Sequence, residues 1–311
     1  MSAPVGVLVM SYGTPATAAD IEAYYTDIRR GRPPSAEQLA DLRRRYEAIG
    51  GLSPLAARTA AQAEGIQASL DAGHPGRFRV FRGDKHATPF IEDGVAAMAG
   101  AGVSAAVGVV LAPHYSALSV GEYLARAAEA CAGAALAFHP VRSWHLAPSL
   151  IDALTARLRV ALGRVVAAGV DPADVEVLVT AHSLPRRILE TGDPYPEQVR
   201  QTGEAVARAA GVGRWRQAWQ SAARTPEPWL GPDVTEVIRA LPGEGARGVV
   251  VAPVGFTSDH LEILYDLDVD ARRVAADAGL AFERTESLND DPGLCAAVAA
   301  AVTGALEATA A

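Results

Sequence analysis

The sequence predicts an α/β protein made of two copies of one domain, each with four strands in a parallel sheet and helices between them. Two observations support this fold class. Short apolar runs alternate with helical patterns along the whole 311-residue chain, which is typical of βαβ units. Two stretches of the first half also recur, in the same order, in the second half. A duplicated domain with a cleft between its two copies is therefore expected.

The repeat consists of two pairs of matching segments. They are LVMSYGTP at 8–15 with LVTAHSLP at 178–185, and VVLAP at 109–113 with VVVAP at 249–253. Extended without gaps, the alignments pair Tyr12 with His182 and Glu122 with Glu262. Each of the four residues follows a predicted strand, so we expect them to line the cleft, one pair on each wall.

The individual elements follow from periodicity and from turn residues. Strands are expected near 5–10, 78–82, 105–111, 135–139, 175–180, 214–219, 249–252 and 281–283. Helices are expected near 18–26, 36–49, 53–71, 89–99, 119–132, 148–168, 196–210, 233–240, 258–278 and 291–309. Four strands then fall in residues 1–142 and four in 143–311, which we take as the two domains, and the last helix is expected to pack back on the first.

An acidic helix follows the buried strand near 249–252. Asp259 can cap this helix, and Glu262, Asp266 and Asp270 stand four residues apart on one face of it. An acidic ladder is usually a solvated helix face. Here it begins at the carboxyl end of a parallel strand, where open α/β sheets bind ligands, and its like charges favour a nearby cation.

His182 stands at the end of another strand of the same half, in VTAHSLP. A lone histidine there is often only a packed, hydrogen-bonded residue. His182 and Glu262 should nevertheless emerge at the same sheet edge, where an imidazole and a carboxylate can bind a divalent metal or move protons. The neighbouring Ser183 does not lie in a G-x-S-x-G motif, which argues against a serine hydrolase.

Segment 25–56 concentrates arginines around a Gly-Gly turn that precedes Ser53; they are Arg29, Arg30, Arg32, Arg43, Arg44 and Arg45. Arginines on helices are commonly just solvated. A cluster that ends at a helix start is also suited to gripping carboxylates or phosphates. The segment matches neither G-x-x-x-x-G-K-[ST] nor G-x-G-x-x-G, so nucleotide binding is not indicated.

Composition narrows the function further. The net charge of −8 argues against nucleic acid or an anionic membrane as the main partner. The cysteines Cys131 and Cys295 are far apart and cannot form a four-cysteine iron–sulfur site or a zinc knuckle. The N-terminal segment has neither the basic region of a signal peptide nor the length of a membrane span, so a soluble, cytoplasmic protein is expected.

These segments together resemble the ferrochelatases, which insert ferrous iron into a porphyrin. The motifs that carry the resemblance are SYGTP, YTDIRRGRPP, RYEAIGGLSPL, LAPHYSALSVGEY, TAHSLPRRILETGDPYPEQV, WQSAARTPEPWLGPDV and PVGFTSDHLEILYDLDVD. They cover nearly the whole chain in the family's order, and the resemblance is to the soluble coproporphyrin III ferrochelatases of Gram-positive bacteria. It implies a class II chelatase-like fold of two Rossmann-like domains.

The resemblance also assigns roles to residues. It implies that His182 and Glu262 form the catalytic metal site, sharing proton removal and metal delivery, with Asp266 and Asp270 as an outer relay. It places Tyr12 across the porphyrin from this pair. The positions that hold propionates fall on Arg29, Arg45, Tyr46, Ser53 and Tyr123.

The expected activity is insertion of Fe²⁺ into coproporphyrin III to give coproheme in heme biosynthesis. Iron is then a substrate, and no tightly bound cofactor and no iron–sulfur cluster are expected. We expect a monomer that makes transient contact with the next enzyme of the pathway. The alternatives are a chelatase for protoporphyrin IX or for another metal or tetrapyrrole, and a tetrapyrrole-binding carrier that is not an enzyme. A periplasmic binding protein would need an export signal.

Overall fold

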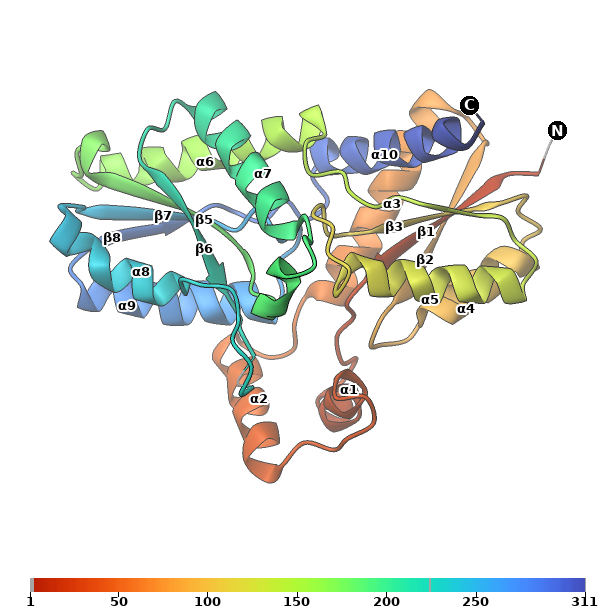
Figure 1. Cartoon of the computed structure of the whole chain (residues 1–311), viewed down its shortest axis with the longest axis horizontal. Helices are drawn as coiled ribbons and strands as arrows, with labels where there is room; N and C mark the ends of the chain where they lie inside the picture. Colours follow the sequence, from red (N-terminus) through yellow and green to blue (C-terminus); the bar gives the residue numbers. More distant parts are fainter. Residues whose placement is uncertain (1–2, 224, 311) are drawn as a thin grey trace.

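The computed structural model describes residues 3–223 and 225–310, and its core is two four-stranded parallel sheets (Figure 1). The first sheet has the order β2-β1-β3-β4, and the second has the order β6-β5-β7-β8. The strands are β1 (Val5–Ser11), β2 (Phe78–Asp84), β3 (Ala106–Val110), β4 (Phe138–Pro140), β5 (Val175–His182), β6 (Trp215–Gln220), β7 (Gly248–Ala252) and β8 (Ala281–Arg284). The matching strand order confirms the predicted fold class.

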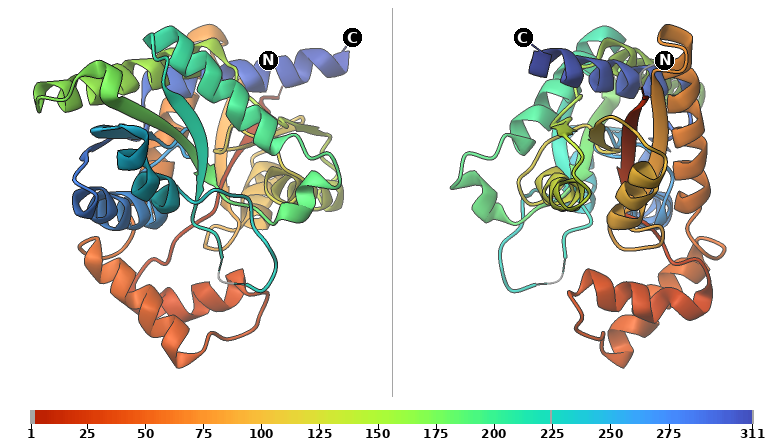
Figure 2. Two further views of the ribbon diagram at one scale, coloured as in Figure 1. Left: turned by 60° about the vertical axis from the view of Figure 1, so that its left-hand side comes forward. Right: turned by 90° about the vertical axis from the view of Figure 1, so that its right-hand side faces the viewer.

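Helices cover both faces of each sheet (Figures 1 and 2). The first half has α1 (Ile21–Ile28), α2 (Ala36–Ala48), α3 (Leu55–Gly73), α4 (Ile91–Gly100) and α5 (Val120–Gly133). The second half has α6 (Pro148–Ala167), α7 (Tyr195–Ala210), α8 (Val234–Ala240), α9 (Arg272–Asp277) and α10 (Pro292–Ala310). Short helical turns are η1 (Ala18–Asp20), η2 (Pro172–Asp174), η3 (Arg186–Leu189) and η4 (Leu241–Glu244), and η5 (Ile263–Ala271) is a π-helix.

One hydrophobic cluster runs through both halves. It contains Val7 of β1, Val177 of β5 and Val298 of α10, each fully buried. Helix α10 contacts α3 in the first half and α6 in the second, so the last helix packs on the first half. Two further clusters are local: one lies under α4 and α5, and the other under α8, η5 and α9. The boundary between 142 and 143 stays a prediction, in the stretch between β4 and α6.

The acidic helix differs from the one expected at 258–278. Its central part, η5, is a π-helix, and α9 follows it. Asp259 does not cap it, because the Asp259 carboxylate instead accepts from Asn289 Nδ2 at 3.0 Å and lies 3.5 Å from Arg284. In a π-helix each turn is wider than in an α-helix. The carboxylates spaced four residues apart therefore do not stack as on an α-helix.

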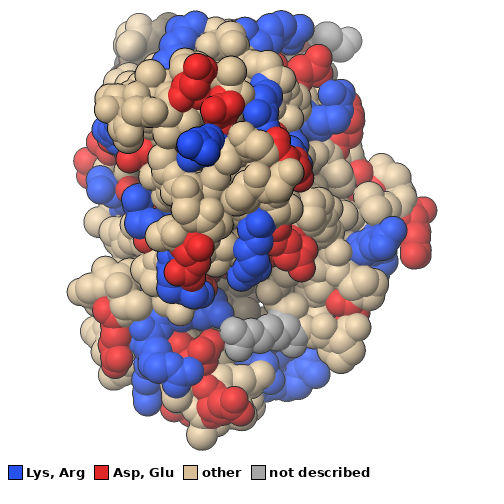
Figure 3. All heavy atoms as spheres, turned by 90° about the vertical axis from the view of Figure 1, so that its left-hand side faces the viewer, with Lys and Arg blue, Asp and Glu red and all other residues tan. Residues whose placement is uncertain are grey.

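Helices α1 and α2 project from the body of the molecule as a separate lobe below both sheets (Figure 1). Basic side chains gather at the lower end of the face shown in Figure 3, interleaved with acids. Elsewhere on that face the charges of both signs alternate. Among residues 3–223 and 225–310, no helix is long and apolar enough to cross a bilayer.

Candidate active site

His182 and Glu262 lie together at the carboxyl end of the second sheet, at the end of β5 and after β7. His182 is the last residue of β5, and its Nε2 is 3.4 Å from Oε1 of Glu262, which immediately precedes η5. Each side chain is about one third exposed, at 34% and 36%. The loop after β7 can approach β5 this closely because Gly255 has no side chain: a Cβ there would lie 2.5 Å from Ala181 Cβ.

A second histidine completes the environment of Glu262. His260 Nε2 is 3.6 Å from Oε2 of Glu262, so the carboxylate stands between two imidazoles. Nδ1 of His182 faces the Ser183 carbonyl oxygen, and Nδ1 of His260 faces that of Ser258. With Nδ1 donating in this way, Nε2 of each ring is directed at Glu262.

These contacts set the charges of the pair. Burial acts to lower the pKa of His182, but Glu262, the Ser183 carbonyl and Asp266 outweigh it and raise that pKa to about 9. Burial acts to raise the pKa of Glu262, but His182 and His260 hold it well below its usual range. At neutral pH the pair is therefore an imidazolium beside a carboxylate.

Asp266 and Asp270 meet different partners. Asp266 accepts a hydrogen bond from Ser221 Oγ and lies 3.7 Å from Arg45 Nη1. Burial and the Glu262 charge raise the pKa of Asp266 to about 6, against the opposing effects of Ser221 and Arg45. Asp270 lies further along η5, 40% exposed and 3.8 Å from Arg273.

Tyrosines of the first half are influenced by the charge of Glu262. Burial is the main reason that the pKa values of Tyr46 and Tyr123 are raised, and the Glu262 carboxylate contributes in both cases. The first half thus supplies neutral phenols around the charged pair of the second half. Tyr46 and Tyr123 are buried, whereas Tyr12 is 42% exposed and packs edge-on against His86.

Glu122, the repeat partner of Glu262, stands in the first turn of α5 within an ion-pair group. It lies 2.6 Å from Nζ of Lys85, the only lysine of the chain, and 3.5 Å from Arg30. The Lys85 ammonium also sits over the Tyr123 ring. The two walls therefore differ in charge: Glu122 is neutralised by fixed cations and Glu262 by histidines.

The predicted propionate residues lie in different settings. Arg45 joins α2 to the second half, through Asp266 and through the Tyr265 ring, which lies 5.1 Å from its guanidinium. Arg29 packs over Tyr25, and its Nε donates to the Arg32 carbonyl. Ser53 is buried, and its Oγ accepts from the backbone N of Leu55 at the start of α3. Among the described residues, no hydrogen bond or ion pair joins Arg29 or Ser53 to the His182–Glu262 pair.

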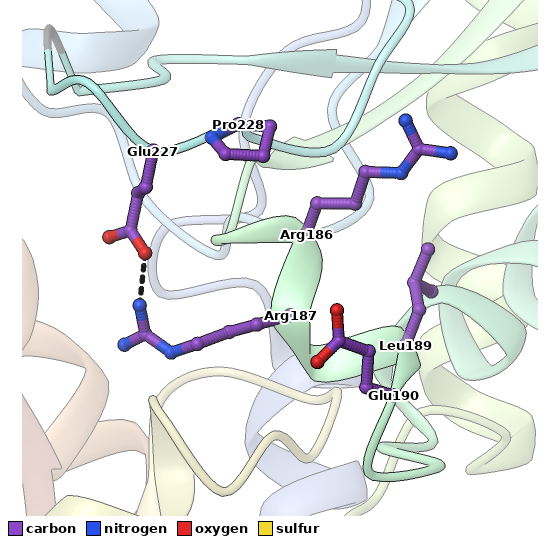
Figure 4. A pocket seen from close by; sticks show the side chains of 6 residues that line it. All are labelled: Arg186, Arg187, Leu189, Glu190, Glu227 and Pro228. Atoms are coloured by element: carbon purple, nitrogen blue, oxygen red, sulfur yellow. Dashed lines mark hydrogen bonds and ion pairs between the residues drawn. The ribbon is translucent and has the colours of Figure 1, made fainter.

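A separate pocket of about 490 Å³ lies beside η3 (Figure 4). Its lining residues are Arg186, Arg187, Leu189, Glu190, Glu227 and Pro228, and Arg187 is paired with Glu227. None of these is a predicted site residue. Within the described part of the chain, no three His, Cys, Asp or Glu side chains form a group arranged to hold a metal ion.

Sequence reasoning missed His260 and Ser221. His260 could have been found, because it stands two residues before Glu262 in SDHLE and so enters the same turn. Ser221 follows β6 in the motif WQSAARTPEP. Its positive φ of 61° could not be predicted from the sequence, because serine rarely adopts this conformation.

Two four-stranded parallel sheets of identical strand order, with His182 at the carboxyl end of the second sheet, form a fold that solved chelatases share. Solved structures of this class are similar: sirohydrochlorin chelatase SirB from Bacillus subtilis subspecies spizizenii in complex with cobalt has a TM-score of 0.56 at 13% identity, covering 98% of this chain and 96% of that one. CbiX of denitrifying bacteria has a TM-score of 0.53 at 15% identity, covering 96% and 98%. At these identities the likeness shows the fold alone.

The family follows from sequence. The family model described as Ferrochelatase matches residues 4–306, and the chain belongs to the ferrochelatase family. A protein of Anoxybacillus flavithermus named coproporphyrin III ferrochelatase is 45% identical over 303 residues, covering 96% of this chain and 95% of its own. Proteins of the same name from Listeria innocua and Bacillus pumilus are each 43% identical, covering 94% and 97% of this chain and 95% and 97% of their own.

Proposed function

We propose that this protein inserts Fe²⁺ into coproporphyrin III to give coproheme, a step of heme biosynthesis. The observation that carries the proposal is the His182–Glu262 pair at 3.4 Å, held at one sheet edge and faced by tyrosines of the other half, in a chain 45% identical to a coproporphyrin III ferrochelatase. Iron is a substrate that enters and leaves with each turnover.

The reaction requires the flat porphyrin to be bent, iron to lose its water, and two pyrrole protons to be removed. Binding energy at the rim can supply the bend without touching the metal. Arg29, Arg45, Tyr46, Ser53 and Tyr123 are the residues we assign to the rim, with Tyr12 facing the ring. His182 and Glu262 take the protons and hand over iron, and Asp266 and Asp270 serve the path outward along η5.

The charge state of the pair sets an order of events. His182 with a pKa of about 9 holds a proton at neutral pH, so it can neither accept a pyrrole proton nor bind iron until that proton leaves. Fe²⁺ approaching Glu262 would favour the loss, because it replaces imidazolium as the partner of the carboxylate. We assign the protein to the cytoplasm, as a monomer that passes coproheme to the next enzyme of the pathway.

The test is to mix the purified protein anaerobically with coproporphyrin III and Fe²⁺ and to follow the porphyrin absorption bands. Repeated turnover to the metalloporphyrin supports the enzyme, whereas a stoichiometric band shift without turnover supports a carrier. Faster turnover of protoporphyrin IX, or turnover only with another metal, would support the other chelatases.

His182→Ala is the matching variant for this assay. It should still bind porphyrin but lose insertion by at least about a hundredfold, the scale of a positioned acid–base or metal group. Porphyrin binding, measured by fluorescence quenching, is the control for folding. Insertion at near the unmodified rate would remove His182 from the mechanism.

A further inference from the structure

A series of hydrogen bonds joins helix α7 of the second half to the loop at 114–117 of the first half. His114 Nε2 lies 2.9 Å from Thr202 Oγ1, and the Tyr115 backbone N donates to Gln198 Oε1 at 2.7 Å. Ser116 Oγ and the Ala117 backbone N both donate to Asp193 Oδ2; the two distances are 2.9 and 2.8 Å. Successive loop residues thus meet successive positions towards the start of α7. We call this contact the α7 seam.

The seam is a firm contact. His114 and Ser116 are 2% and 0% exposed, so water competes little for their bonds. The carboxylate of Asp193 accepts both bonds at its end of the seam, and hydrogen bonds to a charged acceptor are stronger than neutral ones. Asp193 is therefore the strongest single link between the loop and the helix.

Asp193 also reaches His182. Its second oxygen, Oδ1, accepts from the Tyr195 backbone N at 3.0 Å, and Tyr195 Oη donates to the His182 carbonyl oxygen at 2.9 Å. On the other side, the loop that holds Ser116 leads directly into α5, whose first turn carries Tyr123. One carboxylate thus connects the wall that carries His182 with the wall that carries Tyr123.

We propose that Asp193 is a positioning residue for metal insertion, which fixes the separation of the two walls and so maintains the bend of the bound porphyrin. This rests on the proposed function. A porphyrin can stay bent only if the walls do not yield, and a displacement of about 1 Å at a distance from the reacting atoms can cost on the order of a hundredfold in rate. The alternative is that Asp193 only holds the first residue of α7, through its bond from the Tyr195 backbone N.

Asp193→Ser separates the two roles. A serine at position 193 can still accept from the Tyr195 backbone N, but it is too short to keep both bonds to Ser116 and Ala117. The matched control is Asp171→Ser, because Asp171 caps η2 before the other end of β5 and accepts from the Ala173 backbone N at 2.8 Å. Ser116→Ala removes one seam bond from the opposite side and serves if Asp193→Ser does not fold.

We expect Asp193→Ser to lower kcat for Fe²⁺ and coproporphyrin III at least about tenfold, with KM changed less than about threefold, and Ser116→Ala to lower kcat by a smaller factor. Asp171→Ser should keep the kcat of the unmodified protein. Resonance Raman spectra should show weaker out-of-plane porphyrin modes in Asp193→Ser. A kcat equal to that of Asp171→Ser, or a loss confined to KM, would overturn the proposal.

The spectra also separate this inference from the proposed function. If the unmodified protein binds coproporphyrin III without inserting iron, the proposed function fails. Stronger out-of-plane modes in the unmodified protein than in the seam variants would still support the role of Asp193, and equal modes would refute it.

Discussion

His182 and Glu262 lie 3.4 Å apart, and each stabilises the charged form of the other, so their titrations are coupled. Glu262→Gln removes the negative charge that opposes the effect of burial on His182. We therefore predict that the pKa of His182 falls from about 9 in the unmodified protein to below its ordinary value in the variant.

The measurement is a titration of the His182 ring signal by NMR, with His182→Ala used to assign it. His260→Ala is the comparison, because it removes only the second imidazole and should leave the pKa of His182 raised. An unchanged His182 midpoint in Glu262→Gln would show that Glu262 is not the source of its charge.

Asp266 is a residue where function and stability oppose one another. Its folded pKa of about 6 lies above the ordinary 3.8, so the folded protein holds a proton that the unfolded chain releases between these values. The stability that this proton provides is complete below pH 3.8 and is lost as pH rises through 6. This pKa difference of about two units corresponds to a free energy of roughly 3 kcal/mol at most.

We predict that Asp266→Asn raises the free energy of unfolding by about 1–3 kcal/mol at pH 8, while impairing insertion. The gain should shrink towards pH 4, where the aspartate is itself neutral. Urea unfolding at both pH values measures it, and Asp270→Asn is the control because Asp270 is exposed. A gain of the same size at both pH values would contradict the titration argument.

At the scale of elements, the sequence was sufficient for the sheets. Runs such as GVVVA have no competing interpretation as a surface helix, and strand ends in a parallel sheet meet at one edge, which placed His182 beside Glu262. The π-helix could not be predicted, because acids spaced four residues apart fit an α-helix equally well. The α7 seam depends on how a helix meets a distant loop, which local periodicity does not encode.

Helix α2 carries three consecutive arginines, and two of them, Arg44 and Arg45, have different surroundings, which gives an internal control. Arg45 and Arg44 both pair with Asp41, but Arg45 also reaches Asp266 and is 30% exposed, whereas Arg44 is 64% exposed. We predict that Arg45→Ala raises KM for coproporphyrin III about tenfold or more, as expected for loss of a charge-assisted contact of roughly 1.5–3 kcal/mol.

The effect of Arg45→Ala on protoporphyrin IX should be smaller, because that ring has two propionates instead of four. Arg44→Ala should change neither KM. Steady-state assays of both porphyrins in the same detergent test this. If Arg44→Ala and Arg45→Ala behaved alike, the assignment of Arg45 to the rim would fail.

At the scale of the whole molecule, α10 and the α7 seam connect the two halves in different ways. The seam is polar and lies beside the site, whereas α10 is apolar and packs in the shared core against α3 and α6. Helix α10 packs tightly on α3 at Gly65, where a Cβ would stand 2.6 Å from Cys295 Sγ. Burial raises the pKa of Cys295 to about 11, so this thiol acts as a small apolar group.

This contact predicts a specific coupling. Gly65→Ala should gain about 1 kcal/mol of helix propensity but lose about 1–3 kcal/mol through overpacking against the sulfur. Cys295→Ala should leave a small void and destabilise slightly. In the double variant the new methyl group occupies the space of the missing sulfur, so it should be at least as stable as the unmodified protein. The coupling energy between the two substitutions should be about 1–3 kcal/mol, and it should be stabilising, whereas the overpacking in Gly65→Ala alone is destabilising.

Urea unfolding of the four proteins, followed by tryptophan fluorescence and by circular dichroism, measures the cycle. A single coincident transition is expected in each, because the shared core joins both halves into one cooperative unit. Kinetic parameters for coproporphyrin III should stay constant in the double variant, since neither position touches the site. Additive effects of the two substitutions would mean that α10 adjusts freely on α3, and that this contact does not fix the relative position of the two halves.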